Sequence, residues 1–167
     1  MNAIRIKKRN GTLENLDITK IQKQTIAATK DVVGVSQSEL EVDSHIKFID
    51  GMSSSDVQQS LIDCAVGKID IDRPNWTFVA ARLQLFDLYH NVGKTIDSVK
   101  GNAYCHLQDY LNNGISEAQK LYPSLADGYD IENLNNYIEP NRDLLFNYLG
   151  IKTLIDRYLV KDENGYI

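Results

Sequence analysis

Cationic side chains gather near a turn and near an expected helix start within the first twenty residues. The cations are Lys7, Lys8, Arg9 and Lys20. Free N–H groups at a helix N-terminus attract anions, so these groups together can hold a polyphosphate. Polar residues between them can meet hydroxyl or amino groups of the same ligand, and these are Glu14, Asn15 and Asp17. The alternative, from the residues alone, is a solvated basic turn without a ligand.

A β-hairpin and a helix are expected to position these side chains. Ala3–Lys8 alternates apolar and polar residues, Asn10-Gly11 predicts a tight turn with positive φ angles, and Thr12–Leu16 can return as the second strand. Asp17 or Thr19 then caps a helix over residues 18–29, in which apolar residues recur at helical spacing. Lys20 therefore lies in the first turn of that helix.

The rest of the chain is predicted to be mainly helical. Ser36 and Glu39 have capping-box spacing for a helix to about Phe48, and serines at 53–55 can cap the next one. Asp72 is expected to cap a helix over Pro74–His90. Further helices are expected at residues 103–113, 117–121, 131–138 and 143–158, before a hairpin turn at Asn164-Gly165. Because a domain seldom stops inside a hairpin, we expect a fragment of a longer polypeptide.

Composition excludes several classes of protein. The 167 residues carry a net charge of −5, which argues against general nucleic-acid binding. Neither an apolar run of about 18 residues nor a signal-peptide core occurs, so we expect a cytoplasmic protein without membrane contact. The two cysteines, Cys64 and Cys105, lie far apart, and the three histidines, His45, His90 and His106, lack metal-ligand spacing. We therefore expect no catalytic residue, no metal site and no covalent cofactor.

The N-terminal run resembles a known regulatory module. Lys8-Arg9-Asn10-Gly11, followed by Leu16-Asp17 and Lys20-Ile21, resembles the opening of an ATP-cone, the nucleotide-sensing module of ribonucleotide reductases. The family usually has aspartate where Asn10 stands, a change that keeps the turn chemistry. Three later blocks, around residues 45–57, 80–86 and 142–159, resemble the middle of the module, its last helix and the lead-in to the catalytic barrel.

The resemblance implies an N-terminal fragment of an aerobic class I reductase alpha subunit. Its fold would be mainly α with a small N-terminal β-hairpin, a four-helix-type ATP-cone at residues 1–93, and a helical linker with a truncated barrel start at 94–167. The segment from Val92 to Asn102, with Gly93 and Gly101 and few large apolar residues, is the best boundary. Reductase chemistry needs a radical-forming cysteine and a reducing cysteine pair. Because Cys64 and Cys105 cannot supply these, the fragment should be inactive alone.

The resemblance also implies which residues contact nucleotide. They are Lys8, Arg9, Glu14, Asn15, Leu16, Asp17, Ile18, Thr19, Lys20, Ser54 and His90. Ser54 stands where threonine is common, and Gln58 where histidine is frequent. His90 stands where relatives place a lysine, for which Lys94 one turn later can substitute.

The implied function is overall-activity control. ATP in the cone permits reduction of ribonucleotides, and so deoxyribonucleotide synthesis for DNA replication, whereas dATP suppresses it, usually by changing subunit assembly. Magnesium is expected with the nucleotide. The implied partners are ATP and dATP, the rest of the alpha subunit, an alpha homodimer or higher oligomer, and the radical-generating beta subunit.

There are two alternatives to this function. A degenerate cone, serving as a structural or subunit-contact cap without nucleotide, stays open because of His90 and Gln58. A transcriptional repressor with an ATP-cone would need paired Cys-x-x-Cys motifs and a basic face, and the sequence has neither.

Overall fold

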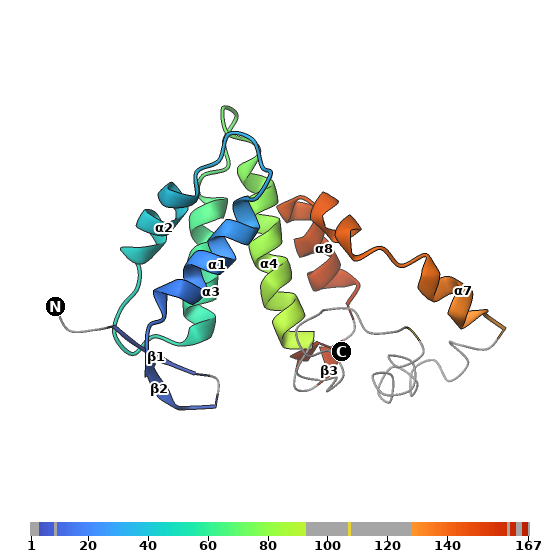
Figure 1. The fold of residues 1–167 in the computed structure, drawn as a ribbon, viewed down its shortest axis with the longest axis horizontal. Coiled ribbons are helices and arrows are strands. Elements are labelled where there is room, and N and C mark those ends of the chain that lie inside the picture. The colour runs from blue at the N-terminus through green and yellow to red at the C-terminus, as the bar shows by residue number, and fades with distance from the viewer. Residues whose placement is uncertain are drawn as a thin grey trace. The chain divides into compact units, whose positions relative to one another are not determined.

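The chain is mainly helical and begins with a small two-stranded sheet, as predicted (Figure 1). The computed structural model describes residues 4–8, 10–92, 107, 128–159, 161–162 and 165–166. Two compact units divide the chain, Met1–Gln84 with Phe146–Leu149, and Leu85–Leu145 with Gly150–Ile167. Within the described ranges, no helix has both the length and the apolar character needed to cross a bilayer.

The N-terminal hairpin consists of strands β1, Arg5–Lys7, and β2, Leu13–Asn15, which pair antiparallel. The Lys8 amide donates to the Thr12 carbonyl and the Gly11 amide donates to the Lys8 carbonyl, both at 2.8 Å. Gly11 has φ +86°, which agrees with the positive φ predicted for this position of the turn.

Helix α1, Ile18–Thr29, has the bounds that its capping signal predicts. Of the two expected caps, Asp17 is the one used: its Oδ1 accepts from the Thr19 amide at 3.0 Å. At the other end of α1, the Arg82 guanidinium donates to the carbonyls of Ala28 and Lys30. Side chains therefore satisfy backbone groups at both ends of the helix.

Helices α2, Gln37–His45, and α3, Ser54–Val66, begin at serine caps. Ser36 Oγ accepts from the Glu39 amide at 3.2 Å. Ser53 and Asp56 form a reciprocal capping box at the start of α3. Helix α2 ends at His45, before the expected end at Phe48, and the chain turns there toward α3.

Helix α4, Trp76–Val92, begins later than predicted. The expected Asp72 cap and Pro74 start are wrong because Asp70 controls this turn: its Oδ1 accepts from the amides of Asp72 at 3.0 Å and Arg73 at 2.7 Å. Helices α1 to α4 supply the buried core of the first unit, in which the large fully buried apolar side chains are Leu40, Leu61, Ile62, Trp76, Val79 and Leu83.

The second unit contains helix α7, Ile131–Asn136, the 3₁₀ helix η1, Pro140–Leu145, and most of α8, Tyr148–Arg157. The single helix expected over residues 143–158 is therefore wrong in its first turn. Strands β3, Lys161–Asp162, and β4, Gly165–Tyr166, pair around the expected C-terminal turn. Apart from Leu107, the expected helices at 103–113 and 117–121 lie outside the described residues, as do Lys94, Cys105, His106 and the 93–94 domain boundary.

Candidate functional site

Four of the predicted nucleotide contacts form one cluster of ion pairs. Lys8 Nζ lies 2.6 Å from Glu14 Oε2, and Lys20 Nζ lies 3.8 Å from Glu14 Oε1. Lys20 Nζ also lies 3.9 Å from Asp17 Oδ2. Glu14 thus links the lysine at the hairpin turn to the lysine in the first turn of α1. The anion-binding elements that the sequence predicts separately are side by side.

Local structure explains why these side chains meet. Lys8 directly follows β1, and Glu14 is the middle residue of β2, so hairpin pairing brings the two together. The chain then passes from Asn15 and Leu16 to the cap Asp17, after which Ile18, Thr19 and Lys20 form the first turn of α1. A short hairpin running directly into a capped helix therefore determines the geometry of the cluster.

The electrostatics of the cluster depend on Glu14. A hydrogen bond from Lys8 holds the pKa of the Glu14 carboxyl below its usual range, with Lys20 adding in the same direction. The Lys20 side chain is 68% exposed, so its ammonium remains accessible to a ligand in solution. With two ammonium and two carboxylate groups, the four side chains sum to zero charge. A polyphosphate would have to displace Glu14 from the lysines to bind them closely.

The start of α3 lies beside the hairpin. The Lys7 amide donates to the Met52 carbonyl at 2.9 Å, and Lys7 pairs with Ser53 as a parallel bridge. Ser54, the predicted phosphate contact, is the first residue of α3. The N-termini of α1 and α3 are therefore both connected to the same small hairpin, which is an arrangement suited to an extended anion.

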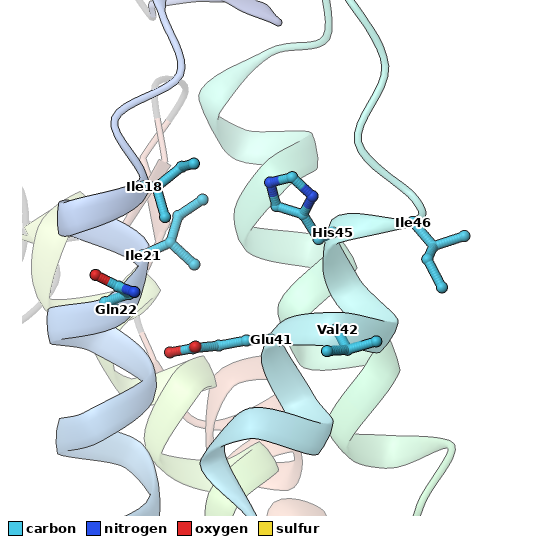
Figure 2. A pocket seen from close by; sticks show the side chains of 7 residues that line it. All are labelled: Ile18, Ile21, Gln22, Glu41, Val42, His45 and Ile46. Atoms are coloured by element: carbon cyan, nitrogen blue, oxygen red, sulfur yellow. The ribbon is translucent and has the colours of Figure 1, made fainter. Parts of the chain in front are cut away.

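An apolar cavity of about 370 Å³ lies between α1 and α2 (Figure 2). Figure 2 shows Ile18 and Ile21 extending from α1 toward α2, and Glu41 extending back toward α1. The Glu41 carboxylate already accepts from Gln37 Nε2 at 2.8 Å. The side chain of Ile18, predicted as a nucleotide contact, thus lines this apolar cavity.

Three other residues singled out in the sequence are Arg9, Gln58 and His90. His90 is exposed near the end of α4 and belongs to the second unit. Arg9 lies outside the described residues. Gln58 is half-buried, and both ends of its amide are used: Nε2 donates to the Leu83 carbonyl at 2.8 Å, and Oε1 accepts from Gln24 Nε2 at 2.6 Å. Gln58 therefore connects α1, α3 and α4.

Sequence reasoning missed the contacts that hold these elements together. Arg5 and Asp50 form a bidentate ion pair across 45 positions of sequence. Gln24 and Gln58 are 34 positions apart. Local spacing carries no signal for such pairs.

In the part of the chain that the structure describes, no three His, Cys, Asp or Glu side chains are grouped so that they could hold a metal ion.

Comparison with known families decides what kind of domain carries this cluster. Residues 4–91 match the ATP cone domain family, which is more than half of the chain. The chain belongs to the ATP-cone family. The matched segment begins at the hairpin and ends near the last residue of α4, so the cluster of Lys8, Glu14, Asp17 and Lys20 lies within the cone.

This ATP-cone chain is similar to ribonucleoside-diphosphate reductase alpha subunits. It is 52% identical over 163 residues to the ribonucleoside-diphosphate reductase subunit alpha of Helicobacter pylori strain J99, covering 98% of this chain and 20% of that protein. It is 28% identical over 157 residues to the ribonucleoside-diphosphate reductase 1 subunit alpha of Escherichia coli K12, covering 94% of this chain and 20% of that protein. The chain thus spans about a fifth of the length of the relatives it matches.

Proposed function

We propose that this ATP-cone is an allosteric regulatory domain that binds ATP and dATP at the cluster of Lys8, Glu14, Asp17 and Lys20. One observation carries the proposal: Glu14 pairs with both Lys8, before the start of α1, and Lys20, in its first turn. The chain that holds this cluster belongs to the ATP-cone family. A triphosphate offers several anionic oxygens in a row. It can therefore engage both ammonium groups and the N–H groups of α1 together.

Glu14 competes with the phosphates for the two lysines in the proposed site. Its carboxylate pairs with both Lys8 and Lys20 in the structure. When phosphates take over the lysines, the carboxylate is released toward the ribose or base, for which Asn15 is a second polar contact. Lys8 and Lys20 would hold the phosphates, Ser54 would donate from the start of α3, and Leu16, Ile18 and Thr19 would enclose the nucleoside. Arg9 and His90 complete the proposed contacts.

Discrimination between ATP and dATP requires a partner for the 2′-hydroxyl. We assign this to Asp17 or Asn15, because a polar partner left unpaired by dATP costs about 1–3 kcal/mol. Asp17 also caps α1, so Asp17→Ala would confuse loss of the cap with loss of recognition. Asp17→Ser keeps a capping oxygen but shortens the side chain. If it left the ratio of the ATP and dATP dissociation constants unchanged, the Asp17 assignment would be wrong.

The wider role follows from the relatives' name. We infer that the cone regulates an attached ribonucleoside-diphosphate reductase alpha subunit in the cytoplasm, with ATP activating and dATP inhibiting. The signal would come from a difference in nucleotide affinity between two assembly states. These states would be an alpha homodimer or a higher oligomer, with or without the radical-generating beta subunit. Because the described residues offer no carboxylate cage, magnesium would arrive on the phosphates and we assign it no protein ligand.

Titration calorimetry with ATP and dATP, in the presence of magnesium, tests the proposal. The wild-type chain should bind, and the Lys8→Ala, Lys20→Ala double variant should bind at least about tenfold more weakly, because two charge-assisted contacts are lost. A double variant of two exposed lysines outside the cluster, Lys23→Ala with Lys47→Ala, removes the same charge and should bind normally. If the folded wild-type chain bound neither nucleotide, the cone would act as a structural cap.

A further inference from the structure

The N-terminal hairpin is too small to hold its own orientation. Its two strands are three residues each, and a two-stranded ribbon alone is marginally stable in water. No residue of either strand is fully buried. Contacts with other segments must therefore keep the hairpin, and with it Lys8, in place.

Asp50, in the loop between α2 and α3, supplies the most direct of these contacts. Its Oδ1 accepts from the Arg5 backbone amide at 2.8 Å and from Arg5 Nε at 3.2 Å. Its Oδ2 accepts from Arg5 Nη2 at 2.8 Å. One carboxylate thus accepts three hydrogen bonds from a single residue of β1, and the planar fork of arginine makes the contact directional.

Backbone bonds extend this contact along the strand. The Gly51 amide donates to the Arg5 carbonyl at 2.8 Å, and the Lys7 amide donates to the Met52 carbonyl at 2.9 Å. Gly51 has φ +87°, a conformation that glycine adopts without strain, and this lets the loop turn alongside β1. The Asp50–Ser53 segment therefore runs beside β1 like a short third strand.

We infer that Asp50 is a positioning residue for the nucleotide site, acting through Arg5 and without touching the ligand. The inference rests on the proposed function. Lys8 comes three residues after Arg5, and Ser54 comes four residues after Asp50, so the Arg5–Asp50 contact sets how far the hairpin lysine lies from the start of α3. A triphosphate spanning both needs that separation to be constant.

Exposure separates this role from a general structural one. The side chains of Arg5 and Asp50 are 56% and 52% exposed, and ion pairs in such positions contribute little to global stability. Loss of the pair should therefore loosen the hairpin while the helices stay folded. The hydrogen bonds from Arg5 hold the pKa of Asp50 to about 2, so the contact keeps its charge at neutral pH.

Calorimetry on three variants of the chain tests the inference. Asp50→Ala should weaken ATP binding about five- to tenfold, and Asp50→Asn, which keeps an acceptor for the Arg5 amide, should weaken it less. The exchanged pair Arg5→Asp with Asp50→Arg should recover part of the loss. Glu139→Ala is the matched control: it removes the exposed Arg142–Glu139 ion pair and should leave ATP affinity unchanged.

Hydrogen exchange supplies a second readout. In Asp50→Ala, the hairpin amides of Lys8 and Leu16 should lose protection, whereas the amides of α3 should keep theirs. Equal loss in both places would indicate a general structural role and overturn the inference, as would wild-type ATP affinity in Asp50→Ala. Failure of the wild-type chain to bind ATP would instead reject the proposed function on which the inference depends.

Discussion

In the first unit, α3 and α4 bury Leu61, Val79 and Leu83 completely, whereas no residue of β1 or β2 is fully buried. The helices are held by apolar packing, which is strong but has little direction. The hairpin is held by ion pairs and hydrogen bonds, which are directional but weak in water. The proposed binding residues belong largely to the second kind of region, where polar groups remain accessible to a ligand.

It follows that substitutions in the helical core and in the hairpin should change stability and ligand binding separately. Elements with few buried apolar contacts open locally at lower free energy than the core. A nucleotide that binds the closed hairpin would stabilise this weaker part most, because binding to the folded state adds stability by mass action.

The largest effect is expected in the helical core. Leu61→Ala removes a side chain that is 0% exposed and should lower the free energy of unfolding by about 2–5 kcal/mol. Chemical denaturation measures this loss. At temperatures where the variant is still folded, its ATP affinity should match the wild type. A loss below about 1 kcal/mol would mean that the core is less tightly packed than described.

A smaller effect is expected at Lys68, a buried cation just after α3 that contacts residues of α2 and α4. Its Nζ lies 2.6 Å from Glu39 Oε1, contacts Asp43, and lies 5.3 Å from the Trp76 ring centroid. Lys68→Ala loses both the packing and the ion pairs and should cost about 1–3 kcal/mol. Lys68→Met keeps the packing and should cost less. Equal losses in the two variants, measured by thermal unfolding, would assign the whole effect to charge.

The cap of α3 should contribute less again. Ser53→Ala removes the Oγ that accepts from the Asp56 amide at 3.0 Å, and should cost about 0.5–2 kcal/mol in unfolding free energy. Ser38→Ala, an exposed serine within α2, is the control and should change stability little. If both variants had the same stability, the capping box would have no energetic role.

The smallest effect concerns pH and the hairpin. The folded-state pKa of Asp50 is about 2, below the ordinary value of 3.8. Its contribution to stability is therefore present above about pH 4 and is lost as the pH falls toward about 2. Asp50→Asn should be slightly less stable than wild type at neutral pH, and the gap should close in acid. Thermal unfolding of both proteins across this pH range measures the difference in stability. A difference that does not change with pH would show that the Asp50 charge does not stabilise the fold.

Local signals explain which parts of the fold the sequence could predict. The bounds of α1 follow from Asp17 and the apolar spacing behind it, and Ser36 and Ser53 cap α2 and α3 through residues three positions away. Helix α8 could not be placed in this way, because it begins at Tyr148, whose amide donates to Thr77 Oγ1, a contact across 71 positions. A tertiary contact of this kind leaves no periodic trace in the sequence.

The candidate site likewise has a part that local sequence predicts and a part that it does not. Lys8, Glu14, Asp17 and Lys20 could be grouped from the sequence because all lie within one hairpin and one helical turn. The Arg5–Asp50 and Gln24–Gln58 contacts could not, since each joins residues more than thirty positions apart. The chemistry of the site is thus local, but the elements that hold it in place are distant in sequence.

The hairpin turn has one further consequence, for the chemical ageing of the protein. Asn10 is exposed and precedes glycine, the order in which asparagine side chains deamidate most readily. Its Oδ1 accepts from the amide of Thr12 at 3.1 Å and from the Thr12 hydroxyl at 2.7 Å, and a carboxylate could accept both bonds equally well. Deamidation proceeds through a succinimide with the Gly11 nitrogen, however, and gives mostly isoaspartate, which lengthens the backbone of the turn by one methylene. Aged protein, detected by intact mass, should therefore have a distorted turn and a new negative charge near Lys8, and should bind ATP less tightly.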